Sequence, residues 1–379
     1  MNKFDAAAFL QDLEQLVNID SGSTNREGTA KVAEILAEKY AVLDWTVRTH
    51  QFDPAVGLCL EISNKPGGPY DVLLIGHMDT VFPAGTAAAR PFTVKGQRAY
   101  GPGVNDMKSG LLLAYYVLGA MHKTGALSKA AICVALNCDE EIGSRYSRHW
   151  IEELARNSRY ALILEPARPN GALVRQRKGV RRYTLEISGV AAHAGVDPEK
   201  GRSAIQEMAH WILALHALTD YSTGTTVNVG VVEAGTAPNV VAANAKAEVD
   251  LRVVDIAEAD KVESTMRNLA AQPKTAGVTA RFICGIERPP LNPSPQSLEL
   301  CRAIEHIGAG LGVDVHWTPT GGGSDGNFTA ALGVPTIDSL GPVGGGSHGN
   351  GEYMEIQSLQ PRFNLLRGII SYLISSYKA

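Results

Sequence analysis

The first 175 residues alternate between segments whose apolar residues recur with helical spacing and short, nearly continuous apolar runs. The helical spacing predicts helices near 5–18, 26–40, 108–122 and 143–157. The apolar runs predict strands near 45–50, 57–63, 71–76, 130–137 and 160–164. Regular alternation of helices and strands favours an α/β domain in which a largely parallel sheet lies between helices.

The pattern changes near residue 178. From VRRYTLEISGV to VTARFICGIE, strands and helices follow in the order β-α-β-β-α-β, which is typical of a ferredoxin-like unit. The proline-rich stretch ERPPLNPSPQ comes next. The α/β pattern then resumes, with helices near 295–310 and 357–377 and a short strand near 334–338. We therefore expect an α+β domain inserted into the α/β domain.

Acidic and histidine side chains directly follow three of the predicted buried strands. DVLLI leads into His77 and Asp79, AAICVALN into Glu140 and Glu141, and YALIL into Glu165. Open α/β sheets place their sites at the carboxyl ends of strands. A histidine beside a carboxylate suits a metal ligand with its orienting partner, although His77 alone could equally be a structural histidine. Adjacent glutamates diverge in direction, so one can bind metal while the other faces a water.

Two further candidates lie in glycine-rich segments. Asp106 stands in GPGVNDMKSG, and His348 stands in GGGSHGNGEY near the C-terminus. Two histidines and several carboxylates that converge in this way suit one or two divalent ions of the zinc type. Because His348 belongs with the strand-end residues, the catalytic domain must be discontinuous. We expect it to comprise 1–176 and 287–379, with 177–286 as the insert.

The motifs HMDTV, AYGPGVNDMKSG, DEEIGS, LEP, AAHAG and GGGSDGNF occur in this order along nearly the whole chain. In this the chain resembles the zinc-dependent aminoacyl-peptidase family of glutamate carboxypeptidases, aminoacylases, acetylornithine deacetylase and succinyl-diaminopimelate desuccinylase. It is most similar to the bacterial folate-cleaving glutamate carboxypeptidase branch. The resemblance implies a mixed, largely parallel sheet sandwiched by helices, of the zinc-exopeptidase type, with an inserted ferredoxin-like lid and dimerisation domain.

The resemblance also implies a metal site with assigned roles. It implies two Zn²⁺ per subunit, replaceable by Co²⁺ or Mn²⁺, with these ligands: His77 and Glu165 on one ion, Glu141 and His348 on the other, and Asp106 between them. Asp79 would orient His77, and Glu140 would be the general base. The peptide bond between Asp106 and Met107 would be cis.

Four residues of the insert and its surroundings are candidates for contacts with substrate. By resemblance, His193 stabilises the oxyanion, often from the partner subunit; the alternative is an ordinary loop histidine. Arg288 and Asn239 match positions that hold the substrate's α-carboxylate or the adjacent carbonyl, although Arg288 could be a solvated hinge charge. Gly323 lies in GGGSDGNF, which could bind an anion through backbone N–H groups or could be a tight structural turn.

The activity that the resemblance implies is hydrolysis of the amide bond to a C-terminal amino acid with a free carboxylate, with a metal-bound water as nucleophile. The substrate would be a small peptide or an N-acyl amino acid. One alternative is an N-acyl-amino-acid deacylase, which uses the same core. Another is a non-catalytic metal-binding homologue, but such a protein is expected to lack a base or a ligand. Here Glu140 and all five ligand positions are present.

Composition limits the possible partners and compartment. A net charge of −4 gives no electrostatic footprint for nucleic acid. No apolar run is long enough for a membrane span, and the first 20 residues predict an amphipathic helix rather than a signal peptide. We therefore expect a cytoplasmic enzyme, although a processed mature secreted protein would look the same, without membrane or nucleic-acid partners, and a homodimer formed through the inserted domain. The five cysteines include no C-x-x-C pair, and Cys133 and Cys138 are expected to be packing residues.

Overall fold

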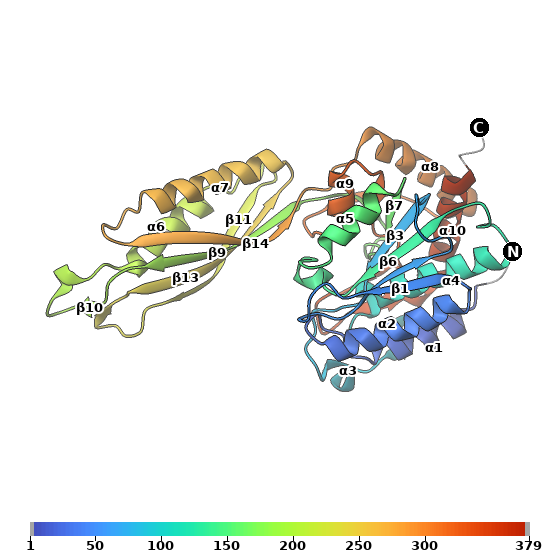
Figure 1. The fold of residues 1–379 in the computed structure, drawn as a ribbon, viewed down its shortest axis with the longest axis horizontal. Coiled ribbons are helices and arrows are strands. Elements are labelled where there is room, and N and C mark those ends of the chain that lie inside the picture. Colours follow the sequence, from blue (N-terminus) through green and yellow to red (C-terminus); the bar gives the residue numbers. More distant parts are fainter. Residues whose placement is uncertain (1–3, 376–379) are drawn as a thin grey trace. The chain divides into compact units, whose positions relative to one another are not determined.

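The computed structural model describes residues 4–375 and divides into two compact units. The first comprises Met1–Gln176, Leu291–Thr320 and Ser324–Ala379. The second comprises Arg177–Pro290 together with Gly321–Gly323. The first unit is therefore built from separate stretches of the chain, and Figure 1 shows it in blue to green and again in orange to red.

The first unit is organised around a six-stranded sheet in the order β1-β2-β6-β3-β7-β16 (Figure 1). Its strands are β1 (Thr46–His50), β2 (Cys59–Ser63), β3 (Val72–His77), β6 (Ile132–Asn137), β7 (Ala161–Ile163) and β16 (Thr336–Ile337). β6, β3, β7 and β16 run parallel, whereas β1 and β2 form an antiparallel edge. Every residue of β2, β3, β6 and β7 is buried, which explains the nearly continuous apolar runs of β3, β6 and β7, while β2 also buries Glu61.

Helices cover both faces of this sheet, so the predicted α/β class is confirmed (Figure 1). α4 (Ser109–Lys123) and α10 (Leu359–Ser375) contact β3, and α9 (Gly326–Ala331) contacts β7 and β16. The unit also contains α1 (Ala6–Val17), α2 (Arg26–Ala41), α3 (Thr86–Ala89), α5 (Arg148–Arg156) and α8 (Pro295–Leu311). The helix predicted near 143 begins only at Arg148, because the chain first makes a tight turn in which Gly143 has a φ of 93°.

Two small sheets in the first unit were not predicted from the sequence. One has the order β17-β18-β5-β4, with β4 (Thr93–Lys95), β5 (Arg98–Tyr100), β17 (Gly344–Gly345) and β18 (Tyr353–Glu355). The other pairs β8 (Leu173–Arg177) with β15 (Trp317–Thr320). The first of these sheets joins a segment near residue 100 to one near residue 350, and this pairing matters for the site described below.

The second unit is a four-stranded antiparallel sheet with the order β11-β13-β9-β14. Its elements are β9 (Gly179–Ser188), α6 (Ala204–His216), β11 (Thr226–Ala234), β13 (Asn244–Val253), α7 (Ile256–Ala271) and β14 (Thr279–Arg288). Alternate strand residues such as Tyr183, Leu185 and Leu251 form a separate core with Trp211 of α6 and Met266 of α7. This element and strand order is that of a ferredoxin-like unit. A two-stranded ladder joins β10 (Ala192–His193) to β12 (Val240–Val241).

Candidate metal centre

Three neighbouring parallel strands bring the predicted site residues to one edge of the sheet. His77 is the last residue of β3 and lies opposite Asn137, the last residue of β6. Glu140 and Glu141 follow β6, and Glu165 follows β7 on the other side of β3. Parallel strands end at the same edge of a sheet, so these side chains are gathered there by topology alone.

Close packing beneath this edge fixes the position of His77. A Cβ on Gly76 would lie 2.6 Å from a methyl group of Leu111 and 2.9 Å from the Met107 side chain. Only glycine therefore allows β3 to pack so closely on the start of α4. The position of Asp106 depends on the same packing, because Asp106 lies in the turn Val104–Lys108 that leads into α4.

Asp106 and His348 both come from irregular backbone. The turn that carries Asp106 begins after Gly103, whose φ of 73° favours glycine. The peptide bond between Asp106 and Met107 is cis, as predicted. His348 has a φ of 63° and lies in the loop between β17 and β18.

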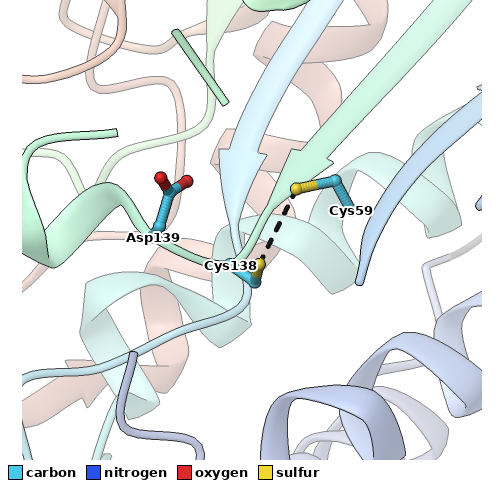
Figure 2. Close-up of side chains that lie close together, drawn as sticks. All are labelled: Cys59, Cys138 and Asp139. Carbon is cyan, nitrogen blue, oxygen red and sulfur yellow. Dashed lines mark hydrogen bonds between the residues drawn. The ribbon is translucent and has the colours of Figure 1, made fainter. Parts of the chain in front are cut away.

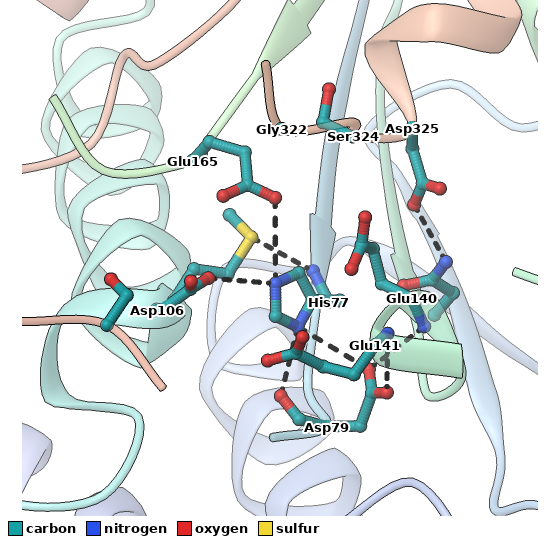
Figure 3. Close-up of polar contacts among 12 residues, drawn as sticks. His77, Asp79, Asp106, Glu140, Glu141, Glu165, Gly322, Ser324 and Asp325 are labelled. Atoms are coloured by element: carbon teal, nitrogen blue, oxygen red, sulfur yellow. Dashed lines mark hydrogen bonds and ion pairs between the residues drawn. The ribbon is translucent and has the colours of Figure 1, made fainter. Parts of the chain in front are cut away.

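Asp106 lies between the two histidines. Its Oδ1 is 3.2 Å from Nε2 of His77, and its Oδ2 is 3.5 Å from Nε2 of His348. Glu165 lies on the His77 side, with Oε1 3.6 Å from Nε2 of His77. Glu141 lies on the other side, with Oε2 3.2 Å from Nε2 of His348. We call these five residues the ligand cluster; Figure 3 shows the side chains of Asp106, Glu141 and Glu165 beside His77.

Glu140 reaches the same space from the neighbouring position. Ligand atoms of His77, Glu140 and Glu165 all lie within 4.8 Å of one another, as do those of His77, Asp106 and Glu141. The two adjacent glutamates thus fall into different groups around one shared histidine. This agrees with the expectation that neighbouring residues diverge and can take separate roles.

Opposing charges in the ligand cluster shift its pKa values. Burial alone would lower the pKa of His77, but hydrogen bonds to Asp106 and Asp79 raise it well above its usual value. Hydrogen bonds to Asp106 and Glu141 raise the pKa of His348 to about 11. Burial raises the pKa of Glu141, although its hydrogen bond to His348 opposes the shift. The neighbouring carboxylates thus favour the protonated form of both histidines, and a cation bound at the same place would displace those protons.

Asp79 contacts both His77 and the two glutamates. Nδ1 of His77 lies 2.9 Å from the backbone oxygen of Asp79 and 3.4 Å from its Oδ1. The carboxylate accepts hydrogen bonds from the backbone N–H groups of Glu140 and Glu141 at 3.2 and 3.1 Å. It also accepts from Oγ of Ser23 at 2.6 Å. The contact of Asp79 with His77 is thus closest through its backbone, while its carboxylate holds the glutamate turn (Figure 3).

The ligand cluster has the donor chemistry that a zinc-type ion requires. It offers imidazole nitrogens and carboxylate oxygens, and the two oxygens of Asp106 face different histidines. Oε1 of Glu141 is buried and has no hydrogen-bond partner among the described residues. A buried carboxylate oxygen without a donor is costly, and a cation would satisfy it. The residues therefore fit one or two divalent ions.

A buried polar network supports the turn that carries the two glutamates, and sequence reasoning missed it. Asn137 donates through Nδ2 to Asp325 at 2.8 Å, and Ser144 donates to the other oxygen of Asp325. Ser147 donates through Oγ to Asp139 and receives from Asn137 at 3.1 Å. We call these five residues the inner network. Their polarity was visible in the sequence, but their mutual contacts depend on the approach of residues near 140 to residues near 325.

A third group of potential metal ligands does not form a credible metal site. Cys59 and Cys138 are buried with their sulfur atoms 3.7 Å apart, and Asp139 follows directly. The Asp139 carboxylate is already bonded to Tyr146 N at 2.7 Å and to Ser147, and Figure 2 shows it directed away from the sulfur atoms. The contact with Cys138, together with burial, raises the pKa of the Cys59 thiol and keeps it protonated. This pair packs as two small apolar side chains.

The four remaining candidate residues belong to the second unit. His193 is exposed on β10 and pairs with Val240 of β12, so it lies next to Asn239. Asn239 accepts a hydrogen bond from Ala194 through its backbone oxygen at 2.9 Å. Arg288 ends β14 and is only 4% exposed, and a Cβ on Gly323 would lie 3.0 Å from its Cδ. Two pairs of candidates, His193 with Asn239 and Arg288 with Gly323, are thus neighbours within this unit.

Comparison with known proteins agrees with this architecture. The family model described as "Peptidase family M20/M25/M40" matches residues 73–372. The chain is 32% identical to carboxypeptidase G2 of Pseudomonas sp. (strain RS-16) over 370 residues, which cover 96% of this chain and 88% of that protein. It is 27% identical to succinyl-diaminopimelate desuccinylase of Burkholderia multivorans over 364 residues, covering 90% and 93% of the two chains.

Solved structures show the same fold. A tripeptidase of Staphylococcus aureus superposes with a TM-score of 0.81 at 24% identity and covers 98% of this chain and 99% of its own. Aminopeptidase PepT of Bacillus cereus superposes with a TM-score of 0.76 at 22% identity, covering 98% and 99%. Within residues 4–375, no helix combines the length and the apolar character needed to cross a bilayer. The family match and the carboxypeptidase relative together establish that this chain is a member of the M20 peptidase family, a family of metal-dependent peptidases and amidohydrolases.

Proposed function

We propose that this chain is a dizinc hydrolase that cleaves the amide bond to a C-terminal amino acid with a free, glutamate-like carboxylate. The observation that carries the proposal is Asp106, whose two oxygens face two different histidines, each accompanied by its own glutamate. This arrangement supports one ion held by His77 and Glu165, a second held by Glu141 and His348, and Asp106 between them. Co²⁺ or Mn²⁺ would fit the same oxygen and nitrogen ligands.

The chain's own groups would divide the chemistry. Bound zinc ions would supply Lewis acidity that polarises the scissile carbonyl and acidifies a water. Glu140 would take the proton from that water and deliver it to the leaving amine, since its neighbour Glu141 is the one beside His348. Asp79 would hold both glutamates in register through the hydrogen bonds to their backbone N–H groups. His193, supplied by the partner subunit of a homodimer, would stabilise the oxyanion.

The similarity to carboxypeptidase G2 supports a carboxylate-bearing leaving group. On this proposal, Arg288 binds the α-carboxylate bidentately, with Asn239 and the backbone of Gly323 beside the substrate. An N-acyl-amino-acid deacylase is the second candidate, because relatives named acetylornithine deacetylase and succinyl-diaminopimelate desuccinylase also match this chain. The two activities differ in the acyl group that they accept, and both are hydrolyses at the same cluster.

The experiment combines metal analysis with a substrate screen. Purified protein loaded with zinc is expected to hold two ions per subunit and to release the C-terminal residue of folate-type and dipeptide substrates that end in glutamate. Efficient cleavage of acetylated or succinylated amino acids, with glutamate-terminated peptides untouched, would select the deacylase. A protein that binds no divalent ion would reject both.

Two variants test the substrate side of the proposal. On substrates with a free carboxylate, Arg288→Lys should lower kcat/KM by an amount that corresponds to about 2–3 kcal/mol of lost transition-state stabilisation. Lysine lacks the planar guanidinium that can bind both carboxylate oxygens. Substrates with an amidated C-terminus should be poor for the wild type and nearly unaffected by this change.

For His193, a purified heterodimer of Glu140→Gln and His193→Ala subunits should regain one working site, although each homodimer is inactive. A dead heterodimer, or a fully active monomer, would place His193 outside the partner's site.

A further inference from the structure

Glu352 is a buried carboxylate close to the ligand cluster that the proposed chemistry does not use. It is 1% exposed and stands four positions after His348 in the sequence. Its Oε2 accepts a hydrogen bond from the N–H of Gly103 at 2.9 Å. Its Oε1 accepts from the N–H groups of Asn105 and Asp106, also at 2.9 Å. Both oxygens are therefore committed to backbone donors.

These three donors belong to the turn that presents Asp106. Asp106 has φ −113° and ψ 92°, so the backbone at this point is not helical and cannot satisfy its N–H groups within a helix. The neighbouring N–H groups of Val104 and Lys108 bond to carbonyls of the same turn, but those of Gly103, Asn105 and Asp106 converge on Glu352. Neighbouring backbone N–H groups that converge on one point form an anion site, and here the anion is a side chain of the same protein.

The same region of the chain also carries His348. Glu352 immediately precedes β18, and Tyr353 of β18 pairs with Tyr100 of β5, just before the Asp106 turn. A second contact joins the two segments, because Nδ2 of Asn105 donates to Oγ of Ser347 at 3.0 Å. The turn that holds Asp106 and the loop that holds His348 are thus joined by hydrogen bonds of Glu352, Asn105 and Ser347.

We propose that Glu352 is a positioning residue that sets the separation between Asp106 and His348 and thereby shapes the second metal position. The inference rests on the dizinc site proposed above. His77 and Glu165 are held by β3 and β7, whereas His348 lies in a loop and depends on Glu352 and Asn105 for its placement relative to Asp106. Loss of Glu352 should therefore weaken the ion at Glu141 and His348 more than the ion at His77 and Glu165.

Glu352→Gln is the sharpest substitution, because it preserves the shape and removes one acceptor. The new amide NH₂ must face either the N–H of Gly103 or the paired N–H groups of Asn105 and Asp106, so at least one hydrogen bond becomes a donor–donor contact. Glu207→Gln is the matched control. Glu207 is also a fully buried glutamate that accepts a backbone N–H, from Thr275 at 2.7 Å, but it lies on α6 of the second unit.

The test titrates metal-free protein with Co²⁺ in competition with a chelator and records the visible absorption of each bound ion. For Glu352→Gln we expect the first ion to bind as in the wild type and the second about 10–100-fold more weakly, the usual cost of removing a residue that orients a ligand. The Co²⁺ spectrum of the second ion should change, and kcat should fall with KM nearly constant. Glu207→Gln should match the wild type in both affinities and in the spectrum.

Ser347→Ala provides a milder second variant, because Ser347 is exposed and its loss should leave folding intact. It removes only the hydrogen bond from Asn105, so the second affinity should fall by about 2–10-fold. Wild-type affinities and spectra in both Glu352→Gln and Ser347→Ala would overturn the inference while leaving the dizinc site in place. A wild-type protein that binds fewer than two Co²⁺ ions would instead overturn the proposed function. If Glu352→Gln does not fold, an unchanged second affinity in Ser347→Ala alone overturns the positioning role.

Discussion

The ligand cluster and the inner network each contain a carboxylate that follows β6, Glu141 in the first and Asp139 in the second, yet these carboxylates differ in hydrogen-bond donors. In the inner network, each oxygen of Asp139 and Asp325 receives a hydroxyl, an amide or a backbone N–H. In the ligand cluster, Oε1 of Glu141 has no partner within the described chain. Burial of acids therefore does not by itself mark a metal site. A shortage of donors among clustered histidines and carboxylates is what a cation would relieve; a lone acid can show the same shortage, as Oε1 of Glu207 does on α6.

The largest effect is expected within the pair of adjacent glutamates. Glu140→Gln should lower kcat by about 10²–10⁴-fold and retain both ions, since it removes a proton acceptor and leaves the ligands in place. Glu141→Gln should lose one ion, since it removes a carboxylate that faces His348. Metal analysis beside steady-state kinetics distinguishes the two. If Glu140→Gln lost metal and Glu141→Gln kept it, the two roles would be exchanged.

Removal of metal should lower the free energy of unfolding, because the ligand cluster loses its cations while the hydrogen bonds of the inner network stay in place. At an ion concentration of about 1,000 times Kd, binding stabilises the native state by about 4 kcal/mol, and a chelator should remove this contribution. Urea denaturation with and without chelator measures the difference. In Glu141→Gln the chelator should have a smaller effect, because one ion is already missing. Equal stability of the wild type in both conditions would mean that the cluster needs no cation.

Asp325→Asn tests the opposite side of the comparison. The change removes one charged acceptor from a network whose donors, Asn137 and Ser144, remain buried. The free energy of unfolding should fall by about 1–3 kcal/mol, the cost of an unsatisfied buried polar group. Metal content should stay at the wild-type level. Loss of an ion with unchanged stability would show that Asp325 belongs functionally to the ligand cluster.

The smallest effect is expected at Asp250, a carboxylate that is paired with arginine side chains instead of a metal ion. Burial alone would raise the pKa of Asp250, but hydrogen bonds from Arg252 and Arg182 lower it. A lowered native pKa contributes stability that is present above the unfolded pKa of about 3.9 and is lost as the pH falls through the native value. Asp250→Asn should therefore cost less than about 1 kcal/mol at pH 7, and the difference from the wild type should vanish in acid. A pH-independent difference would assign the effect to packing.

The convergence of the strand-end residues could be predicted from the sequence because strand ends are local features. His77, Glu140, Glu141 and Glu165 each follow an apolar run that is long enough to be recognised as a buried strand. The α/β class and the inserted α+β pattern rest on the same periodicity. The M20 family was predicted from the motifs and is confirmed.

The features that were missed depend on contacts between distant segments. Nothing in NGEYME distinguishes Glu352 from a surface glutamate until β18 is paired with β5. The same applies to Asp325, whose partners Asn137 and Ser144 lie nearly two hundred positions earlier in the chain. The late start of α5 was missed for a local reason, because the hydrophobic pattern carried no sign of the turn at Gly143.

The separation of the ligands along the chain has a consequence for biosynthesis. Domains generally form as the polypeptide emerges, beginning at the N-terminus. His77, Asp106 and Glu165 are synthesised before the second unit, whereas His348 and Glu352 follow it. On the proposed assignment, a nascent chain could capture its first ion early, but the second position would stay incomplete until the last stretch had docked. Occupancy of that second position would then report that the segment carrying His348 and Glu352 has docked on the earlier ligands.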